Sequence, residues 1–356
     1  MDKKAAIEIQ FNWIFVLIIG VVILGFFVSI INKQKTIAEE QISTSIKVNL
    51  GAVLTGARAA TSTASRINIP DIDIIYDCDG YIVGKANAIR SKTSFSPNLI
   101  KGPVIMSWTH EWRMPYRVNN FMYITSPFVR YIFVNDPAGL ASQVYSALPN
   151  RTIVDQGDVK AFFTKELVNA NELSSITDEN HYKVRVIFFG DSANPESVEL
   201  PSLGGVKSRD FTALQIKANS FQDLDETGEL VFFTERGDSF SETGRSVYVG
   251  EASAFGAIFA DEAETYECNM QMAFNTLEIV NAIYWGRVKQ MKTHYQSTSD
   301  PNNCQVPYTQ ADSYFNSIDQ ATRDFNTASA NSLFSASNGI MQQNEESLRR
   351  SCPAIY

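Results

Sequence analysis

The chain of 356 residues is poor in positive charge. It carries 30 lysines and arginines against 39 aspartates and glutamates, a formal net charge of −9, and only 19% of its residues are charged. Nucleic-acid binding requires a basic surface that neutralises phosphates, so this composition argues against nucleic-acid partners. It also argues against a domain that lies flat on anionic lipid.

Metal ligands are scarce as well. The chain has three histidines, His110, His181 and His294, and its four cysteines include no C-x-x-C pair. A histidine-rich metal site and a thiolate metal site are therefore not expected. The binding or assembly role predicted below implies no metal and no organic cofactor.

The four cysteines are even in number and widely spaced, which favours disulfides in an oxidising compartment. Four cysteines allow three connectivities. If a C-terminal helix ends near Gly339, the chain can return Cys352 to Cys268 and leave Cys304 for Cys78, which is the pairing we predict. Four unrelated buried thiols in a cytoplasmic domain are the alternative.

What the chain does have is one long apolar run, residues 11–31, without a charge and about 30 Å long as a helix. A secretory signal is usually about 7–15 apolar residues followed by a small-residue cleavage site. This run is longer and ends in IINKQK, so we predict a retained transmembrane helix. A buried core helix is the alternative, but such helices rarely lack a polar face over this length.

The positive-inside rule does not decide the orientation of this span, because lysines flank both ends of the run. The segment before it, residues 1–10, is a short stub. The cysteines favour an oxidising environment for the rest of the chain. We therefore expect a cytoplasmic N-terminus and an extracytoplasmic bulk, in a single-pass protein of the cell membrane.

The segment after the span, residues 32–66, is predicted to be a helical stalk and linker. Its apolar positions recur at steps of four and three on one helical face. They are Ile42, Ile46, Leu50, Val53 and Ala57. The helix is expected to continue to about residue 60 and to end in TSTAS. An anchor alone does not need this second apolar stripe, so the stalk must pack against something.

Residues 67–260 are predicted to form an α/β domain with a mixed sheet. Compact apolar runs such as FMYITS, RYIFV, RTIVD and KVRVIFFG read as strands, and PAGLASQVYSAL and DVKAFFTKELVN read as helices between them. This order predicts βαβ units and a partly parallel sheet. The later strands lack intervening helices and are expected to run antiparallel.

Residues 261–356 are predicted to form an antiparallel helical pair. Apolar residues at alternating steps of three and four from Tyr266 to Met291 predict a long amphipathic helix. STSDPNNCQVP follows as a loop. The second helix is expected to run through YFNSIDQATRDFNTASANSLF and to end or bend at SASNG.

The string IIYDCDGYIV resembles the first motif of the haloacid-dehalogenase-like phosphatases, in which a strand ends in Asp-x-Asp-Gly-Thr. The resemblance implies a Mg²⁺-dependent phosphohydrolase with Asp77 as nucleophile and Asp79 as general acid/base. It further implies roles for Ser126, for Lys165 or Lys160, and for Asp191 in a metal-binding motif.

This string departs from the family pattern, since Tyr81 replaces the usual threonine and Pro195 stands where a second acidic residue is expected. No helical cap follows the first motif. The alternative is an Asp-Gly turn after a strand.

The segment SWTHEWRMPYR is rich in aromatic and arginine side chains, a combination enriched at protein interfaces. Its candidate binding residues are Trp108, His110, Glu111, Trp112, Arg113 and Arg117. The alternative is a strand pair in which the aromatic rings fill the core and the glutamate and arginines form an ion-pair network.

The first sixty residues resemble the N-terminus of type IV pilin-like proteins, notably archaeal ones. They share a short basic leader, an apolar helix with the early Glu8, an amphipathic continuation and a globular head. The resemblance implies helices that bundle as a filament core, and residues 3–6 as a processing site. Glu8 falls nearer to that site than the family's spacing. A simple signal anchor with a helical stalk is the alternative.

These patterns together predict a non-enzymatic component of the cell surface that binds or assembles with protein partners. Self-association through the N-terminal helix is included in this hypothesis. The phosphohydrolase is the alternative function.

Overall fold

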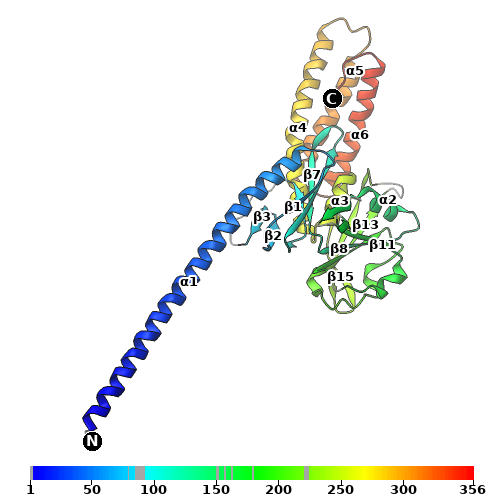
Figure 1. Ribbon diagram of the computed structural model, residues 1–356. Coiled ribbons are helices and arrows are strands. Elements are labelled where there is room, and N and C mark those ends of the chain that lie inside the picture. The colour runs from blue at the N-terminus through cyan, green and yellow to red at the C-terminus, as the bar shows by residue number, and fades with distance from the viewer. Residues whose placement is uncertain are drawn as a thin grey trace.

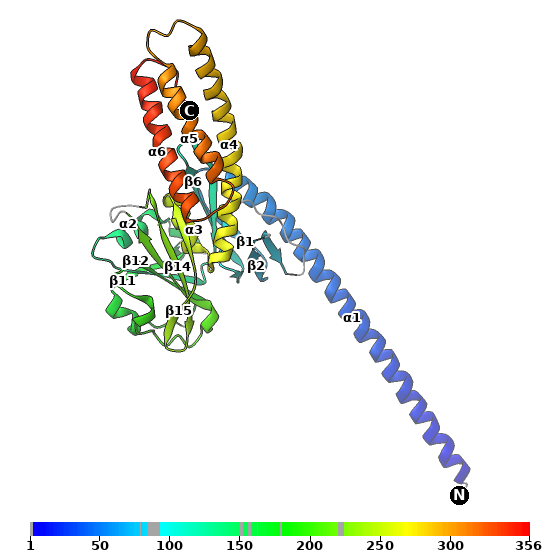
Figure 2. The same cartoon turned by 180° about the vertical axis from the view of Figure 1, so that it is seen from behind.

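The first helix, α1 (Lys3–Ala59), is one continuous element of 57 residues. The computed structural model describes residues 3–356 apart from residues 79, 85–92, 150–151, 156–157, 162, 179 and 220–223. Figures 1 and 2 show α1 leaving the rest of the protein, here called the head, as a single long rod. The predicted continuation of the helix to about residue 60 is confirmed.

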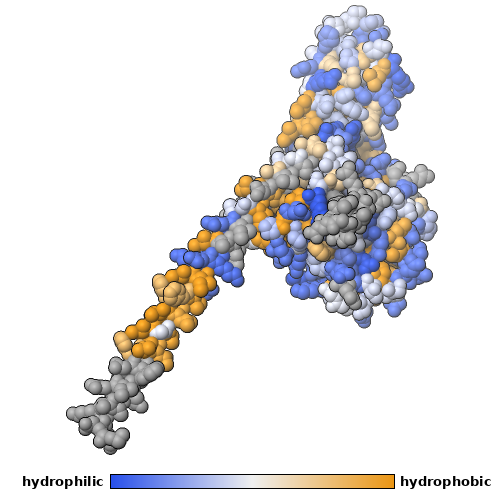
Figure 3. Space-filling model, in the orientation of Figure 1, coloured by the Kyte–Doolittle hydropathy of each residue, from blue (hydrophilic) through white to orange (hydrophobic). Residues whose placement is uncertain are grey.

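The outer part of α1 is apolar on all sides. Its segment Phe15–Lys35 has a mean hydropathy of 2.8 and is 0% buried, and it is long and apolar enough to cross a membrane. Figure 3 shows this apolar surface as an almost unbroken orange band on the protruding helix. Such a surface is what a retained anchor and a signal sequence have in common.

The inner part of α1 packs against the head. Ser43, Ile46 and Leu50 are buried. Ile46 and Leu50 belong to the predicted apolar stripe, and Ser43 does not. The side chains of Ile42, Val53 and Ala57 lie outside the described residues. Steps of three and four bring 43, 46 and 50 to one face of a helix, so a narrow stripe is enough to hold α1 to its partner strands.

The packed part of α1 contacts β6 (Val104–Arg113) and β7 (Arg117–Thr125) of the next sheet, and it contacts β3 of a small sheet with the order β3-β2-β5. Its strands are β2 (Ile74–Asp77), β3 (Gly80–Val83) and β5 (Leu99–Ile100). Ile46 and Leu50 belong to one apolar cluster with side chains of these strands, among them Ile74, Tyr81 and Val83. Burial of this cluster fixes α1 on the head.

A second sheet has the order β1-β6-β7-β4. Its strands are β1 (Ala64–Asn68), β4 (Ser94–Phe95), β6 (Val104–Arg113) and β7 (Arg117–Thr125). β1, β6 and β7 pair antiparallel, and β4 is parallel to β7. The chain after α1 therefore enters a sheet at Ala64, inside the segment predicted as a linker.

The largest sheet has six strands in the order β11-β8-β12-β13-β14-β15. They are β8 (Val129–Val134), β11 (Thr164–Val168), β12 (Lys183–Phe189), β13 (Phe211–Ala218), β14 (Thr227–Arg236) and β15 (Ser239–Val249). The first four strands in this order are parallel, and β14 and β15 are antiparallel. The predicted mixed sheet is confirmed.

Helix α2 (Leu140–Ala147) connects β8 to a parallel neighbour, as the βαβ prediction requires. The predicted helix DVKAFFTKELVN is wrong. This segment forms β10 (Asp158–Ala161), which pairs with β9 (Thr152–Asp155), and then β11. Its apolar spacing suits either element, and the pairing of β11 with the edge of β8 decides for a strand.

Three short 3₁₀ helices lie in the connections around this sheet. They are η1 (Ala170–Ser175), η2 (Pro195–Ser197) and η3 (Ser208–Asp210). Asn194 caps η2 by accepting a hydrogen bond from the backbone of Glu196.

A buried helix, α3 (Glu251–Phe259), lies between the four-stranded and six-stranded sheets and contacts strands of both. Every residue from Ala252 to Phe259 is buried. The guanidinium of Arg185, itself buried on β12, donates to the carbonyls of Ala257 and Ile258. It thereby satisfies the carbonyl groups at the end of α3 that have no partner within the helix. The sequence did not predict this helix.

Three long helices form the C-terminal part, where the sequence predicted a pair. They are α4 (Ala263–Ser297), α5 (Gln305–Ala321) and α6 (Thr327–Arg349), and they pack side by side away from the sheets (Figure 1). The break falls before Asn326, which caps α6. It does not fall at SASNG, because Gly339 lies within α6, where a Cβ would meet the ring of Tyr314 at 2.5 Å.

The disulfides are Cys78–Cys268 and Cys304–Cys352, so the predicted pairing is wrong. Because α6 continues through Gly339, Cys352 follows the end of α6 and meets Cys304, which directly precedes α5. Cys78 follows β2 and binds Cys268 near the start of α4. The bridge Cys304–Cys352 thus lies within the C-terminal helical part. The bridge Cys78–Cys268 joins the small sheet under α1 to the start of α4.

Candidate functional site

The residues expected to form a phosphatase site lie on three different sheets. Asp77 ends β2 of the small sheet, Ser126 follows β7 of the four-stranded sheet, and Asp191 follows β12 of the six-stranded sheet. An active site of this type needs its residues at the carboxyl ends of neighbouring strands in one parallel sheet. Asp79 and the side chain of Lys160 lie outside the described residues.

Each of these side chains has a local role. Asp77 stands opposite Gly80 in the β2–β3 hairpin, which is the Asp-Gly turn left open as the alternative. The Ser126 hydroxyl donates to the carbonyl of Lys101 at 2.9 Å. Asp191 is 82% exposed and pairs with Lys217 at 2.8 Å.

Lys165 closes the end of α2. Its Nζ donates to the carbonyls of Tyr145 and Leu148 at 2.5 and 3.0 Å and lies 4.3 Å from the centre of the Tyr145 ring. Burial lowers the pKa of Lys165 to about 8. The bonds satisfy carbonyls that the last turn of α2 leaves open, which is a structural task.

The tryptophans of the aromatic segment belong to the core. Trp108 is 7% exposed and Trp112 is 1% exposed. The Trp112 ring stacks on Phe121 and Phe274, with centroids 5.1 and 6.1 Å apart, and its Nε1 donates to the carbonyl of Val249 at 3.1 Å. These contacts correspond to the alternative in which the rings of a strand pair fill the core.

The charged residues of the same segment pair with one another at the surface. Glu111 lies 2.8 Å from Arg113 and 3.0 Å from Arg117. His110 lies 3.3 Å from Glu251, the first residue of α3. The two arginine side chains are more than half exposed, so these pairs contribute little to stability.

Four of the six candidate binding residues nevertheless line a pocket of about 530 Å³. They are His110, Glu111, Trp112 and Arg113. The start of α3 and one face of α6 complete its wall, with Phe334 and Asn338 among the residues that α6 contributes. The segment predicted to bind therefore borders a concavity, and its role in binding stays a prediction.

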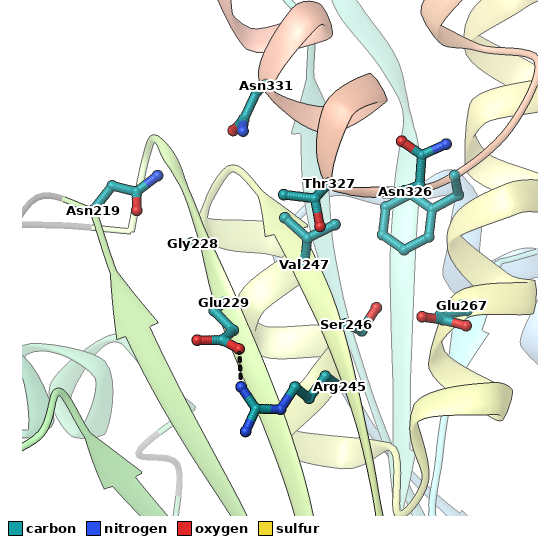
Figure 4. A pocket seen from close by; sticks show the side chains of 11 residues that line it. Asn219, Gly228, Glu229, Arg245, Ser246, Val247, Glu267, Asn326, Thr327 and Asn331 are labelled. Carbon is teal, nitrogen blue, oxygen red and sulfur yellow. Dashed lines mark hydrogen bonds and ion pairs between the residues drawn. The ribbon is translucent and has the colours of Figure 1, made fainter.

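A second pocket, of about 500 Å³, opens on the other side of the contact between β14 and α6. Figure 4 shows its side chains around one space, contributed by β14, β15, α4, the first turns of α6, the residues just before α6 and Asn219 after β13. Thr227 links β14 to α6, since its hydroxyl donates to Oδ1 of Asn331 at 2.8 Å. The α6 residues at 327, 331, 334 and 338 recur at steps of four and three, so one face of α6 serves both.

Sequence reasoning missed this second pocket. Its residues come from positions 219 to 331 and share no motif. The capping residue Asn326 was the local signal available, and a cap by itself marks only the start of a helix.

The chain matches no protein-family model, no curated protein and no solved structure.

Proposed function

We propose that this protein is a membrane-anchored component of the cell surface that assembles with its neighbours through α1, in the manner of a pilin-like protein. The observation that carries the proposal is the division of α1 into an exposed apolar part and a part packed on the head. The head would lie on the extracytoplasmic side, and α1 would cross the membrane once.

The exposed part of α1 needs an apolar environment. Apart from Ile30, its large side chains from Phe15 to Ile31 have exposed fractions between 41% and 67%. Burying one such side chain contributes about 1.5–3 kcal/mol, so the whole run represents on the order of 20 kcal/mol or more. Lipid can supply this environment, and so can the α1 helices of other copies.

The continuity of α1 favours assembly over anchoring alone. The apolar segment ends at Lys35, and Ser43, eight positions later, is the first buried residue among those whose side chains the structure describes. At about 1.5 Å per residue this distance is about 12 Å. A helix without an intervening loop holds the head close to the membrane at one fixed angle, which a simple tether does not require.

The disulfides support an extracytoplasmic head. Both bridges lie in the head, and no cysteine among the described residues is unpaired. Structural disulfides persist in oxidising compartments and are rare in the cytosol.

The test replaces residues 11–35 of the full-length chain with an unrelated apolar helix of equal length and leaves the head and the packed part of α1 unchanged. We expect the variant to remain in the membrane fraction and to lose its oligomers. Chemical cross-linking in native membranes, followed by electrophoresis, measures the oligomers.

A matched control replaces exposed Ile283 on α4 with alanine, which removes apolar surface far from α1. This control is expected to cross-link as the native protein does. Equal cross-linking by the helix-replaced variant would show that α1 is an anchor without an assembly role.

A further inference from the structure

The pocket of Figure 4 has the side chains that recognise hydroxyl groups. Its wall combines three amides, Asn219, Asn326 and Asn331, with the carboxylates Glu229 and Glu267. An amide presents a donor and an acceptor in one plane, and a carboxylate presents two acceptors, so these groups can pair with neighbouring hydroxyls of a ligand. Phe325 adds an aromatic ring to the same wall.

Hydrogen bonds within the protein hold two of the amides in fixed orientations. Asn219 donates from Nδ2 to Thr227 at 3.0 Å, and Asn331 accepts from Thr227 through Oδ1. Among the described residues, these two hydrogen bonds leave Oδ1 of Asn219 able to accept from a ligand. They leave Nδ2 of Asn331 able to donate to one. Polar groups held in place before binding cost less to order when a ligand arrives.

The capping residue of α6 is arranged in the same way. Oδ1 of Asn326 accepts from the backbone of Ser329 at 2.9 Å, which directs its Nδ2 away from the helix.

The charges of the pocket disfavour an anionic ligand. Arg245 is held by hydrogen bonds from its guanidinium to Glu242 at 2.7 Å and Glu229 at 2.8 Å, and these two carboxylates raise the pKa of Arg245. Its positive charge is therefore compensated. Glu267 adds a negative charge from α4, and no lysine lies among the residues of this wall.

We infer that this pocket binds a neutral carbohydrate, with the amides and Glu267 on its hydroxyl groups and Phe325 beside an apolar face of a sugar ring. Amide donors with fixed orientation, compensated charge and an aromatic ring together fit a neutral polyhydroxylated ligand. A cationic peptide would depend on the carboxylates, and Glu229 is already paired with Arg245 at 2.8 Å. This inference is independent of how α1 assembles.

The experiment uses the full-length chain in lipid nanodiscs, because sugar-based detergents would compete for the pocket. The probes are cellobiose, lactose and N,N′-diacetylchitobiose, and saturation-transfer difference NMR measures their binding. We expect saturable binding of at least one disaccharide.

Two variants test the site itself. Glu267→Gln removes the negative charge with little change of shape, and Asn331→Asp keeps the acceptor for Thr227 while removing the amide donor. Each is expected to weaken saccharide binding by about tenfold, the effect of losing one hydrogen bond to a polar ligand. Glu278→Gln, an exposed change elsewhere on α4, is the matched control and should bind as the native protein does.

Asn331→Asp is expected to change the affinity for a cationic ligand in the opposite direction from the affinity for a sugar. A tetralysine peptide, as a cationic probe, would bind more tightly to Asn331→Asp, whereas a sugar binds less tightly. Saturable tetralysine binding that rises in this variant would overturn the inference. So would the failure of all three disaccharides to bind, or saccharide binding that neither variant reduces.

Discussion

The two longest helices, α1 and α4, carry their apolar residues in different ways. The outer part of α1 is apolar on every side and 0% buried, whereas α4 buries one face through Tyr266, Met270, Ala273, Phe274 and Leu277, among others. Both helices have the same backbone geometry. The distribution of apolar residues around the axis, rather than helix length, decides whether a helix belongs to the head or needs a different environment.

The two helices are also held by different means. The inner part of α1 depends on Ile46, Leu50 and the small sheet, while α4 is tied to α5 by polar contacts as well. The disulfide Cys78–Cys268 connects these two systems, since it joins the sheet under α1 to the start of α4. Substitutions in the disulfide, in α1 and at the α4–α5 contact test this difference between the two helices.

The largest effect is expected from removing the disulfide that joins the two systems. Replacing Cys78 and Cys268 with serine opens a loop of 190 residues and should lower the free energy of unfolding by about 5 kcal/mol. Replacing Cys304 and Cys352 opens a loop of 48 residues and should cost about 4 kcal/mol. Urea unfolding of the full-length variants measures both. The reverse order would show that strain or residual structure, rather than loop length, governs these bridges.

An arginine placed on the exposed apolar surface of each helix should have different effects in α1 and in α4. Ile23→Arg places a charge at the centre of the apolar segment and should raise the free energy of membrane insertion by about 3 kcal/mol. Ile283→Arg, on the exposed face of α4, should change the stability of the head by less than about 0.5 kcal/mol. Membrane flotation and thermal unfolding check the pair. An insertion defect in Ile283→Arg would mean that α4 also contacts the membrane.

The smallest effect concerns the polar tie between α4 and α5. Asp312 accepts from Nε1 of Trp285 at 2.6 Å and from Nζ of Lys292 at 2.7 Å. Burial raises the pKa of Asp312, but these two bonds outweigh burial and lower it. Asp312→Asn should lower the free energy of unfolding by about 1 kcal/mol at neutral pH.

The pH dependence follows from the same bonds. Because the pKa of Asp312 is lower in the folded state, its stabilisation is present above the ordinary pKa of an aspartate. It is lost as the pH falls through the folded value. The difference between native protein and Asp312→Asn should therefore shrink in acid. Asp319→Asn, at a looser surface pair of 3.7 Å with Arg323, is the control and should show a smaller difference at neutral pH.

Part of the fold could be predicted because its signals are local. The periodicity around Ile46 and Leu50 predicted the packed face of α1, and the strands around α2 predicted the parallel part of the six-stranded sheet. Segment 158–169 was assigned wrongly because its apolar spacing fits a helix, while pairing at a sheet edge made it a strand. The buried α3 carries apolar and small residues on all sides, so its spacing gave no clear signal.

The candidate sites divide in the same way. The aromatic segment around Trp112 was visible in the sequence, and it borders a pocket because β6 carries it to the start of α3. The pocket at Asn331 was not visible, since its residues come from two strands, two helices and the connections after β13 and before α6. The motif around Asp77 was visible in the sequence, but the residues expected to act with Asp77 lie on other sheets.

The apolar segment of α1 follows from the amino-acid sequence alone, because length and hydropathy along one contiguous run decide whether a helix can cross a membrane. The disulfide pairing and the pocket walls follow instead from tertiary packing. These depend on which distant residues the packed sheets and helices bring together, and in particular on α6 continuing past Gly339 so that Cys352 reaches Cys304. A one-dimensional pattern does not contain those distances, since they follow from the packing of the whole head.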